Sequence, residues 1–88
     1  MRIKLYAPWV QSLKEKRMIA KSLIAKVRAR FNVSIIEIDG QDVHKTLMLG
    51  IVFAAHDNSS ADSINEKLLS FIEGSTEAQI TEIQKETC

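Results

Sequence analysis

Alternating polar and apolar positions open the chain. In residues 2–7 every second side chain is apolar, which is the period of a half-buried β-strand. Pro8 ends this strand because proline cannot donate to a hydrogen-bond ladder. After a short connector, Ser12 precedes Glu15 by three residues. This spacing is typical of a capping box and predicts the start of a helix.

The clearest predicted element is a helix at residues 13–30. Its apolar side chains recur at intervals of three and four, as on one face of a helix, and the segment contains neither Gly nor Pro. Asn32 follows, and Asn tolerates the backbone conformation of a helix exit. The apolar stripe consists of Ile19, Ala20, Leu23, Ile24, Val27 and Phe31.

Two further strands are predicted after this helix. Residues 33–38 are rich in β-branched side chains, residues 39–42 carry a turn signal, and residues 46–55 read as a long strand. This third strand is apolar on both of its alternating faces. We therefore expect either that both faces are covered within the chain, or that one face packs on helices and the other on a partner.

A second helix and a weaker strand complete the pattern. The helix opens in residues 57–60, with Ser59 and Asp62 at capping spacing, and Gly74 supplies a stop signal. Residues 78–83 predict a fourth strand. The core stripe of this helix consists of Ile64, Leu68, Phe71 and Ile72.

The order strand, helix, strand, strand, helix, strand predicts an α+β protein. The simplest packing is a ferredoxin-like βαββαβ fold, with two helices on one face of a four-stranded antiparallel sheet. The 88 residues of the chain suffice for one domain, at residues 1–88, and are too few for two. With 45% hydrophobic and 26% charged residues, the composition is that of a folded protein and not of a disordered segment.

The sequence also bears on location. No apolar run approaches the ~18 residues of a membrane span, and Arg2 and Lys4 interrupt the short apolar stretch that a signal peptide would need. Cys88 is the one cysteine, so the chain cannot form an internal disulfide. We expect a cytoplasmic protein without a membrane partner.

Charge is divided unevenly along the chain. Residues 1–31 hold nine Lys and Arg against one Glu, or +8, and residues 32–88 hold three Lys against ten carboxylates, or −7. On the first helix, four of the cations fall within about 60° of one another, while Lys16 and Arg30 are expected to flank the core on the opposite edge. Cations at this density suit phosphate contacts, although they also serve as ordinary solvating charges. These four residues, called the basic ridge below, are Lys14, Arg17, Lys21 and Arg28.

Aromatic residues give little support to base stacking. RNA-binding domains of this topology stack bases on aromatic side chains in their central strands, and here the third strand offers Phe53 alone. Tyr6 and Trp9 are the other candidates, and packing in the core or in an interface explains them at least as well. Binding to structured RNA through its backbone stays open.

No catalytic or metal-binding pattern is visible. His44 and His56 have acidic neighbours, but their spacing matches no recognised ligand motif. Gly40 and Gly50 form no phosphate-cradling loop. We therefore predict no metal, no cofactor and no catalytic residues.

Several segments resemble a known bacterial family. They are the run SLKEKR at residues 12–17, the run RFNVSI at residues 30–35, Glu37, the pair at residues 49–50 and the segment at residues 69–73. In these the chain is similar to the domain of unknown function 503 (YlxP-like) family. The resemblance implies a ferredoxin-like fold and a cytoplasmic bacterial protein. It also implies association with RNA or the ribosome, because genes of the family often lie near genes for translation. It carries over no catalytic residues.

Three hypotheses follow. The first is a non-enzymatic accessory factor that docks the basic ridge, assisted by Lys16, on structured RNA or a ribosomal subunit. The second is a protein-interaction module that forms a homodimer through the outer face of its sheet, with Ile36, Met48 and Val52 in the interface. The third is a regulatory domain that binds a small ligand, because this fold hosts many functions.

Overall fold

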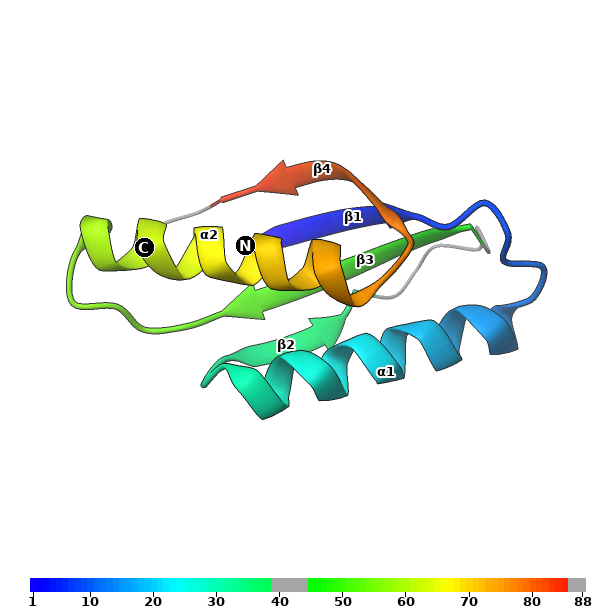
Figure 1. Cartoon of the computed structure of the whole chain (residues 1–88), viewed down its shortest axis with the longest axis horizontal. Coiled ribbons are helices and arrows are strands. Elements are labelled where there is room, and N and C mark those ends of the chain that lie inside the picture. Colours follow the sequence, from blue (N-terminus) through cyan, green and yellow to red (C-terminus); the bar gives the residue numbers. More distant parts are fainter. Residues whose placement is uncertain (39–44, 86–88) are drawn as a thin grey trace.

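The computed structural model describes residues 1–38 and 45–85, and these contain six elements in the expected order. The strands form one sheet in the order β2-β3-β1-β4, with all neighbours antiparallel. Both helices lie on the same face of this sheet (Figure 1). The ferredoxin-like α+β prediction is therefore confirmed. The elements are β1 (Arg2–Tyr6), α1 (Leu13–Arg30), β2 (Ser34–Glu37), β3 (Thr46–Val52), α2 (Asn58–Ser75) and β4 (Gln79–Gln84).

Strand β1 lies in the middle of the sheet, between β3 and β4. Ile3 is opposite Leu49 on one side and Ile83 on the other. The register with β4 shifts between Lys4 and Leu5, and the Thr81 hydroxyl donates to the Lys4 carbonyl at 3.3 Å. The first and last strands of the chain are thus direct neighbours.

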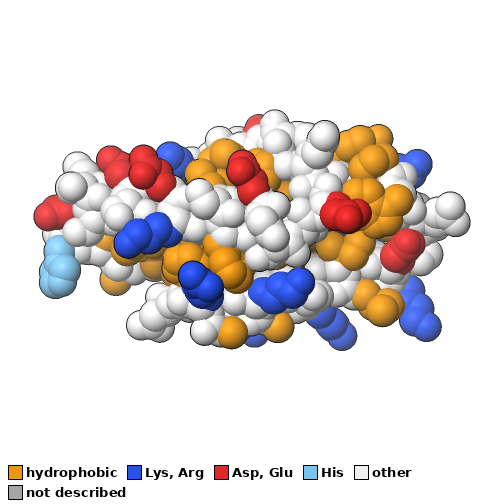
Figure 2. Space-filling model, viewed as in Figure 1, with side chains coloured by type: hydrophobic (Ala, Val, Ile, Leu, Met, Phe, Trp, Pro, Cys, Tyr) orange, Lys and Arg blue, Asp and Glu red, His pale blue; other side chains and the backbone are white. Residues whose placement is uncertain are grey.

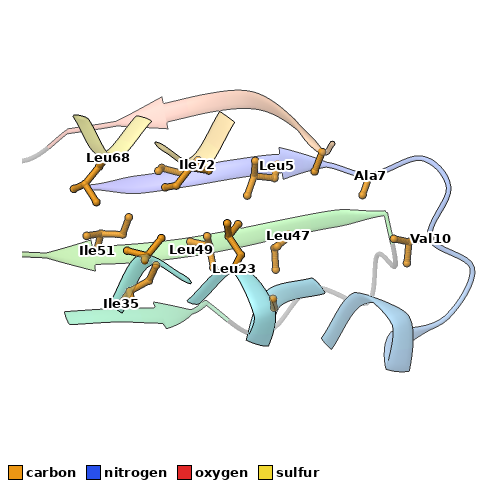
Figure 3. Packing of buried hydrophobic residues seen from close by; sticks show 14 residues of the cluster. Leu5, Ala7, Val10, Leu23, Ile35, Leu47, Leu49, Ile51, Leu68 and Ile72 are labelled. Atoms are coloured by element: carbon orange, nitrogen blue, oxygen red, sulfur yellow. The ribbon is translucent and has the colours of Figure 1, made fainter. Parts of the chain in front are cut away.

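The core lies between the sheet and the two helices (Figure 3). Strand β3 shows how it is built, because Leu47, Leu49 and Ile51 are buried against the helices while Val52 is exposed. From α2, Leu68 packs into the same cluster (Figure 3). Full burial of such an aliphatic side chain contributes roughly 1.5–3 kcal/mol, so the alternation along β3 fixes which face of the sheet receives the helices.

The start and end of α2 differ from the sequence prediction. The N-cap is Asp57 and not Ser59, because the Asp57 carboxylate accepts the backbone N–H of Ser60 at 2.7 Å. The helix also runs through Gly74 to Ser75 before Thr76 takes an extended conformation. A carboxylate satisfies the first free N–H groups of a helix well and suits the positive end of its dipole.

We predict a pH-dependent role for Asp57. Hydrogen bonds from Ser60, the backbone N–H first, lower the pKa of this carboxyl. A depressed pKa stabilises the fold above the ordinary carboxyl value of about 4, and this contribution is lost as pH falls through the folded value. Asp57→Ala should therefore lower the melting temperature at neutral pH, and its difference from wild type should shrink below about pH 4. Melting curves across this range, with Asp57→Asn as the uncharged cap, test the prediction; a constant difference contradicts it.

Asn65 is a buried polar residue in α2. It is 8% exposed and lies on the core-facing side with Leu68 and Ile72. Within residues 1–38 and 45–85 its Oδ1 atom has no hydrogen-bond partner. The predicted core stripe of this helix did not include Asn65, because a polar side chain between apolar ones is ordinarily placed on the surface.

Candidate nucleic-acid interface

The basic ridge lies on the flank of α1 that faces away from the core. Ala20, Leu23 and Val27 are the buried apolar side chains of this helix, and at 100° per residue the ridge is turned by roughly 120° from them. Lys14 and Lys21 are exposed, as is Arg17. Figure 2 shows Lys and Arg side chains along the lower edge of the molecule, where α1 runs. The helix therefore presents a cationic surface to solvent.

The last residue of the basic ridge also has a structural contact. The Arg28 Nη2 atom donates to the carbonyl oxygen of Ile35 in β2 at 3.1 Å. Strand β2 is an edge of the sheet, and a charged side chain on a free backbone group is one of the ways in which edges are protected from pairing. Arg28 therefore joins the ridge to the sheet edge and is less available to a ligand than its three neighbours.

Lys16 was expected to flank the core and to assist the basic ridge, but the structure places it on the buried face of α1. It is 8% exposed and belongs to the buried face of α1 together with Ala20 and Val27. Long cationic side chains can cover apolar surface with their methylene groups. The expected assisting role at the ridge therefore does not match the position of Lys16, which packs toward the core.

The capping box at the start of α1 is confirmed in its main contact. The Ser12 Oγ accepts the backbone N–H of Glu15 at 3.1 Å, and a Glu15 carboxylate oxygen accepts the N–H of Gln11 at 3.4 Å. An acidic side chain thus stands at the positive end of the helix. The helix end itself is occupied by the chain's own groups, and the ridge side chains remain as the candidate groups for contact with an anion.

The outer face of the sheet, opposite the helices, carries an apolar patch on β2 and β3. Ile36 on β2 is 61% exposed and lies opposite Gly50 of β3. On β3, Val52 on one side of Gly50 is 71% exposed, and Met48 on the other side has intermediate exposure. At Gly50, a Cβ atom would lie 3.2 Å from the Ile38 Cδ1 atom. Because glycine has no Cβ, the side chains of Ile36 and Ile38 can pack over the β3 backbone at this position. The apolar surface therefore continues from β2 to β3. No described element of the chain covers it.

A cleft of about 560 Å³ lies between the two helices. The Phe31 and Phe71 rings meet edge to face, with centroids 5.6 Å apart, and the Arg30 guanidinium carbon is 5.5 Å from the Phe71 centroid. Figure 2 shows hydrophobic side chains between α1 and α2 with Lys and Arg beside them. No pattern in the sequence predicts this pairing, because it depends on how the helices pack. A small-ligand role would use this cleft, which is lined by Arg30, Phe31, Glu66, Lys67, Ser70 and Phe71.

The remaining candidates from the sequence are His44, His56 and Cys88. In residues 1–38 and 45–85, no group of three or more His, Cys, Asp or Glu side chains is placed to hold a metal ion. His56 is exposed, and His44, Cys88 and the predicted turn at residues 39–42 lie outside the described residues. Neither described helix is long and apolar enough to cross a membrane.

Comparison with known proteins identifies the family. The model of the family described as "Protein of unknown function (DUF503)" matches residues 1–85. The chain belongs to the DUF503 family. It is also 34% identical over 70 residues to the "Uncharacterized protein YlxP" of Bacillus subtilis (strain 168), and this match covers 80% of the chain and 76% of the relative.

Membership of the DUF503 family confirms the resemblance seen in the sequence. Neither the family description nor the name of the Bacillus subtilis relative states an activity or a partner. We therefore infer the function from the surfaces of this chain. Those surfaces are the basic ridge on α1, the apolar patch on the outer face of the sheet, and the cleft between the helices.

Proposed function

We propose that this protein is a non-enzymatic accessory factor that docks on structured RNA, such as the RNA of a ribosomal subunit, through the basic ridge. Such a factor works in the cytoplasm. The observation that carries the proposal is the group of three exposed cations, Lys14, Arg17 and Lys21, on one flank of a rigid helix. Glu15 is the one acid in α1, and it projects about 100° or more away from each of them.

The spacing of these cations favours backbone docking over base reading. At a rise of 1.5 Å per residue, Lys14 and Lys21 are about 10 Å apart along the helix axis. Cations in such a row can follow phosphates along one RNA strand, and phosphate contacts position a protein without reading sequence. The central strands offer no row of aromatic side chains for successive bases, so phosphate contacts by the ridge are the basis of the proposed affinity, and structured RNA is the ligand class that it fits.

Affinity for structured RNA should therefore depend steeply on salt. With three phosphate contacts, the logarithm of the binding constant should fall with the logarithm of salt at a slope of about −2 to −3, which is roughly a 16- to 64-fold loss between about 50 and 200 mM. The variant Arg17→Glu/Lys21→Glu should bind at least about tenfold more weakly at low salt and show a shallower slope. Fluorescence anisotropy with a labelled ribosomal RNA fragment measures both.

A matched control separates the ridge from net charge. Lys67→Glu/Lys85→Glu makes the same change in charge at two exposed positions outside α1, and it should retain most of the affinity. Circular dichroism must show that both variants fold as the wild type does. Equal losses of RNA affinity in the two variants would mean that the attraction depends on net charge and not on the ridge. If the wild type does not bind RNA near about 50 mM salt, the RNA proposal is wrong.

A second function is supported by the apolar patch. We propose that the patch joins two copies of the chain, with Ile36, Met48 and Val52 in the interface. Ile36 and Val52 are more than half exposed on neighbouring strands, and contiguous apolar surface of this kind marks interaction sites in soluble proteins. The side chains of the patch are uncharged, so the same apolar surface on a second copy complements it.

Sedimentation of the wild type tests this second proposal. A dimer at micromolar concentration is the expected result, and a monomer throughout the accessible range contradicts it. The two proposals are compatible, because α1 lies on one face of the sheet (Figure 1) and the side chains of the patch are on the opposite face. A dimer would thus carry two ridges, and linking two RNA sites raises the overall affinity.

A further inference from the structure

The turn between β1 and α1 has an anchored backbone and carries an exposed tryptophan. The backbone N–H of Val10 donates to the Ala7 carbonyl at 3.1 Å, which places Pro8 and Trp9 at the centre of a closed turn. Ala7 and Val10 are buried, at 5% and 1% exposure, whereas Trp9 is 42% exposed. The turn is therefore anchored in the core at both ends and presents Trp9 at its tip.

Further contacts fix this turn relative to the sheet and the helix. The Ala7 N–H donates to the Lys45 carbonyl at 2.7 Å, next to the start of β3. On the other side, Gln11 and Ser12 are held by the capping contacts with Glu15. Because the backbone of this turn is already anchored, Trp9 loses little backbone freedom when it binds a partner, and an indole side chain has only two torsions to fix.

Trp9 is also close to the start of the basic ridge. Five residue steps separate Trp9 from Lys14, so their Cα atoms are at most about 17 Å apart even for an extended chain. The actual distance between these Cα atoms is shorter, because the chain turns at the Ser12 cap and enters α1 at Leu13. One RNA molecule that lies along the ridge can therefore reach Trp9 within a few nucleotides.

The basic ridge and Trp9 suit different parts of one RNA ligand. The ridge takes phosphates, and an exposed indole ring offers a surface on which an unpaired base stacks. Bases inside a duplex are already stacked on one another and cannot use Trp9. An unpaired nucleotide next to a helical stem can satisfy both surfaces at once.

We propose that Trp9 is a binding residue that stacks on an unpaired base, so the ligand is a stem with an adjoining unpaired nucleotide and not a fully paired duplex. This rests on the proposed docking of RNA by the ridge. Stacking on an aromatic residue changes affinity by about 5- to 150-fold when the residue is removed. The wild type should therefore prefer the stem with the unpaired nucleotide over the paired duplex by a factor in this range.

The chain provides its own probe for the test, because Trp9 is its one tryptophan. Titration with a short hairpin that carries a three-nucleotide unpaired end should quench the fluorescence of Trp9, since a stacked base is in contact with the indole. Titration with a fully paired duplex of equal phosphate number should leave the fluorescence nearly unchanged.

Variants complete the test. Trp9→Leu should lose the preference for the unpaired end and keep the affinity for the duplex, while Trp9→Phe should retain part of the preference. Tyr6→Leu is the control, because Tyr6 is equally exposed, at 41%, but lies in β1 of the sheet. Circular dichroism checks that every variant is folded.

The outcomes separate this inference from the proposal on which it rests. If both RNAs bind with a steep salt dependence but with equal affinity and no quenching, the stacking role of Trp9 is overturned and the ridge stands. If neither RNA binds, the proposed function itself fails. If Trp9→Leu instead changes sedimentation and leaves RNA binding unchanged, Trp9 belongs to a contact between proteins and the inference is wrong.

Discussion

Replacing Leu49 by alanine should lower the free energy of unfolding by about 3 kcal/mol, within a range of roughly 2–5. Leu49 is fully buried in β3, opposite Ile3 on one neighbouring strand and Glu37 on the other. The loss combines the transfer energy of the missing methyl groups with the cavity that they leave. Because a domain of this size has only about 5–15 kcal/mol in total, the melting temperature should fall by more than about 10 °C.

The matched control is Val52→Ala. Val52 belongs to the same strand but points to the outer face and is 71% exposed. In a monomer its truncation should change the free energy of unfolding by no more than about 0.5 kcal/mol. Urea denaturation followed by circular dichroism measures both variants, and the slope with urea should stay the same. Similar losses at the two positions would contradict the one-sided packing of β3.

The variant Ile36→Lys/Val52→Lys should convert a dimer into a monomer. Both side chains lie in the apolar patch, and lysines there would bring four like charges together in an interface that offers them no partners. We expect the dissociation constant to rise at least about 100-fold. The monomer should still fold, because both positions are exposed and point away from the core.

Sedimentation equilibrium at several concentrations measures this change. Met18→Lys is the control, because Met18 is 63% exposed and lies on α1, away from the sheet face. It should sediment as the wild type does. If the double variant and the wild type form dimers of equal stability, the interface is elsewhere on the molecule. A wild type that stays dimeric while the double variant is monomeric supports the patch as the interface.

An element was predictable from the sequence where its cap and its apolar pattern lie within its own residues. Helix α1 begins after Ser12 and ends at Arg30 as expected, because its cap and its apolar stripe both lie within its own residues. The start of α2 was less clear, since Asp57 and Ser59 are both good caps within one helical turn. The carboxylate of Asp57 is the group that binds the free N–H.

The side on which a residue lies was harder to predict. Lys16 precedes Ala20, Leu23 and Val27 by four, seven and eleven residues, and this spacing puts it on the same face as these apolar side chains. The spacing was a usable signal, but a cationic residue is ordinarily placed on the surface. Contacts between elements left no signal in the sequence: the guanidinium of Arg30 over Phe71 and the hydrogen bond from Arg28 to β2 depend on tertiary packing.

The position of β1 between β3 and β4 determines when the sheet can be completed during synthesis. Its pairing with β4 joins residues about as far apart as the chain allows, such as Arg2 and Gln84. Closing so long a loop is entropically unfavourable and slows folding. On a translating ribosome, β1 leaves the exit tunnel before β4 and keeps one open edge until β4 has also emerged. Until then the nascent chain exposes one edge of its own central strand, and the emergence of β4 is the step that lets the sheet close.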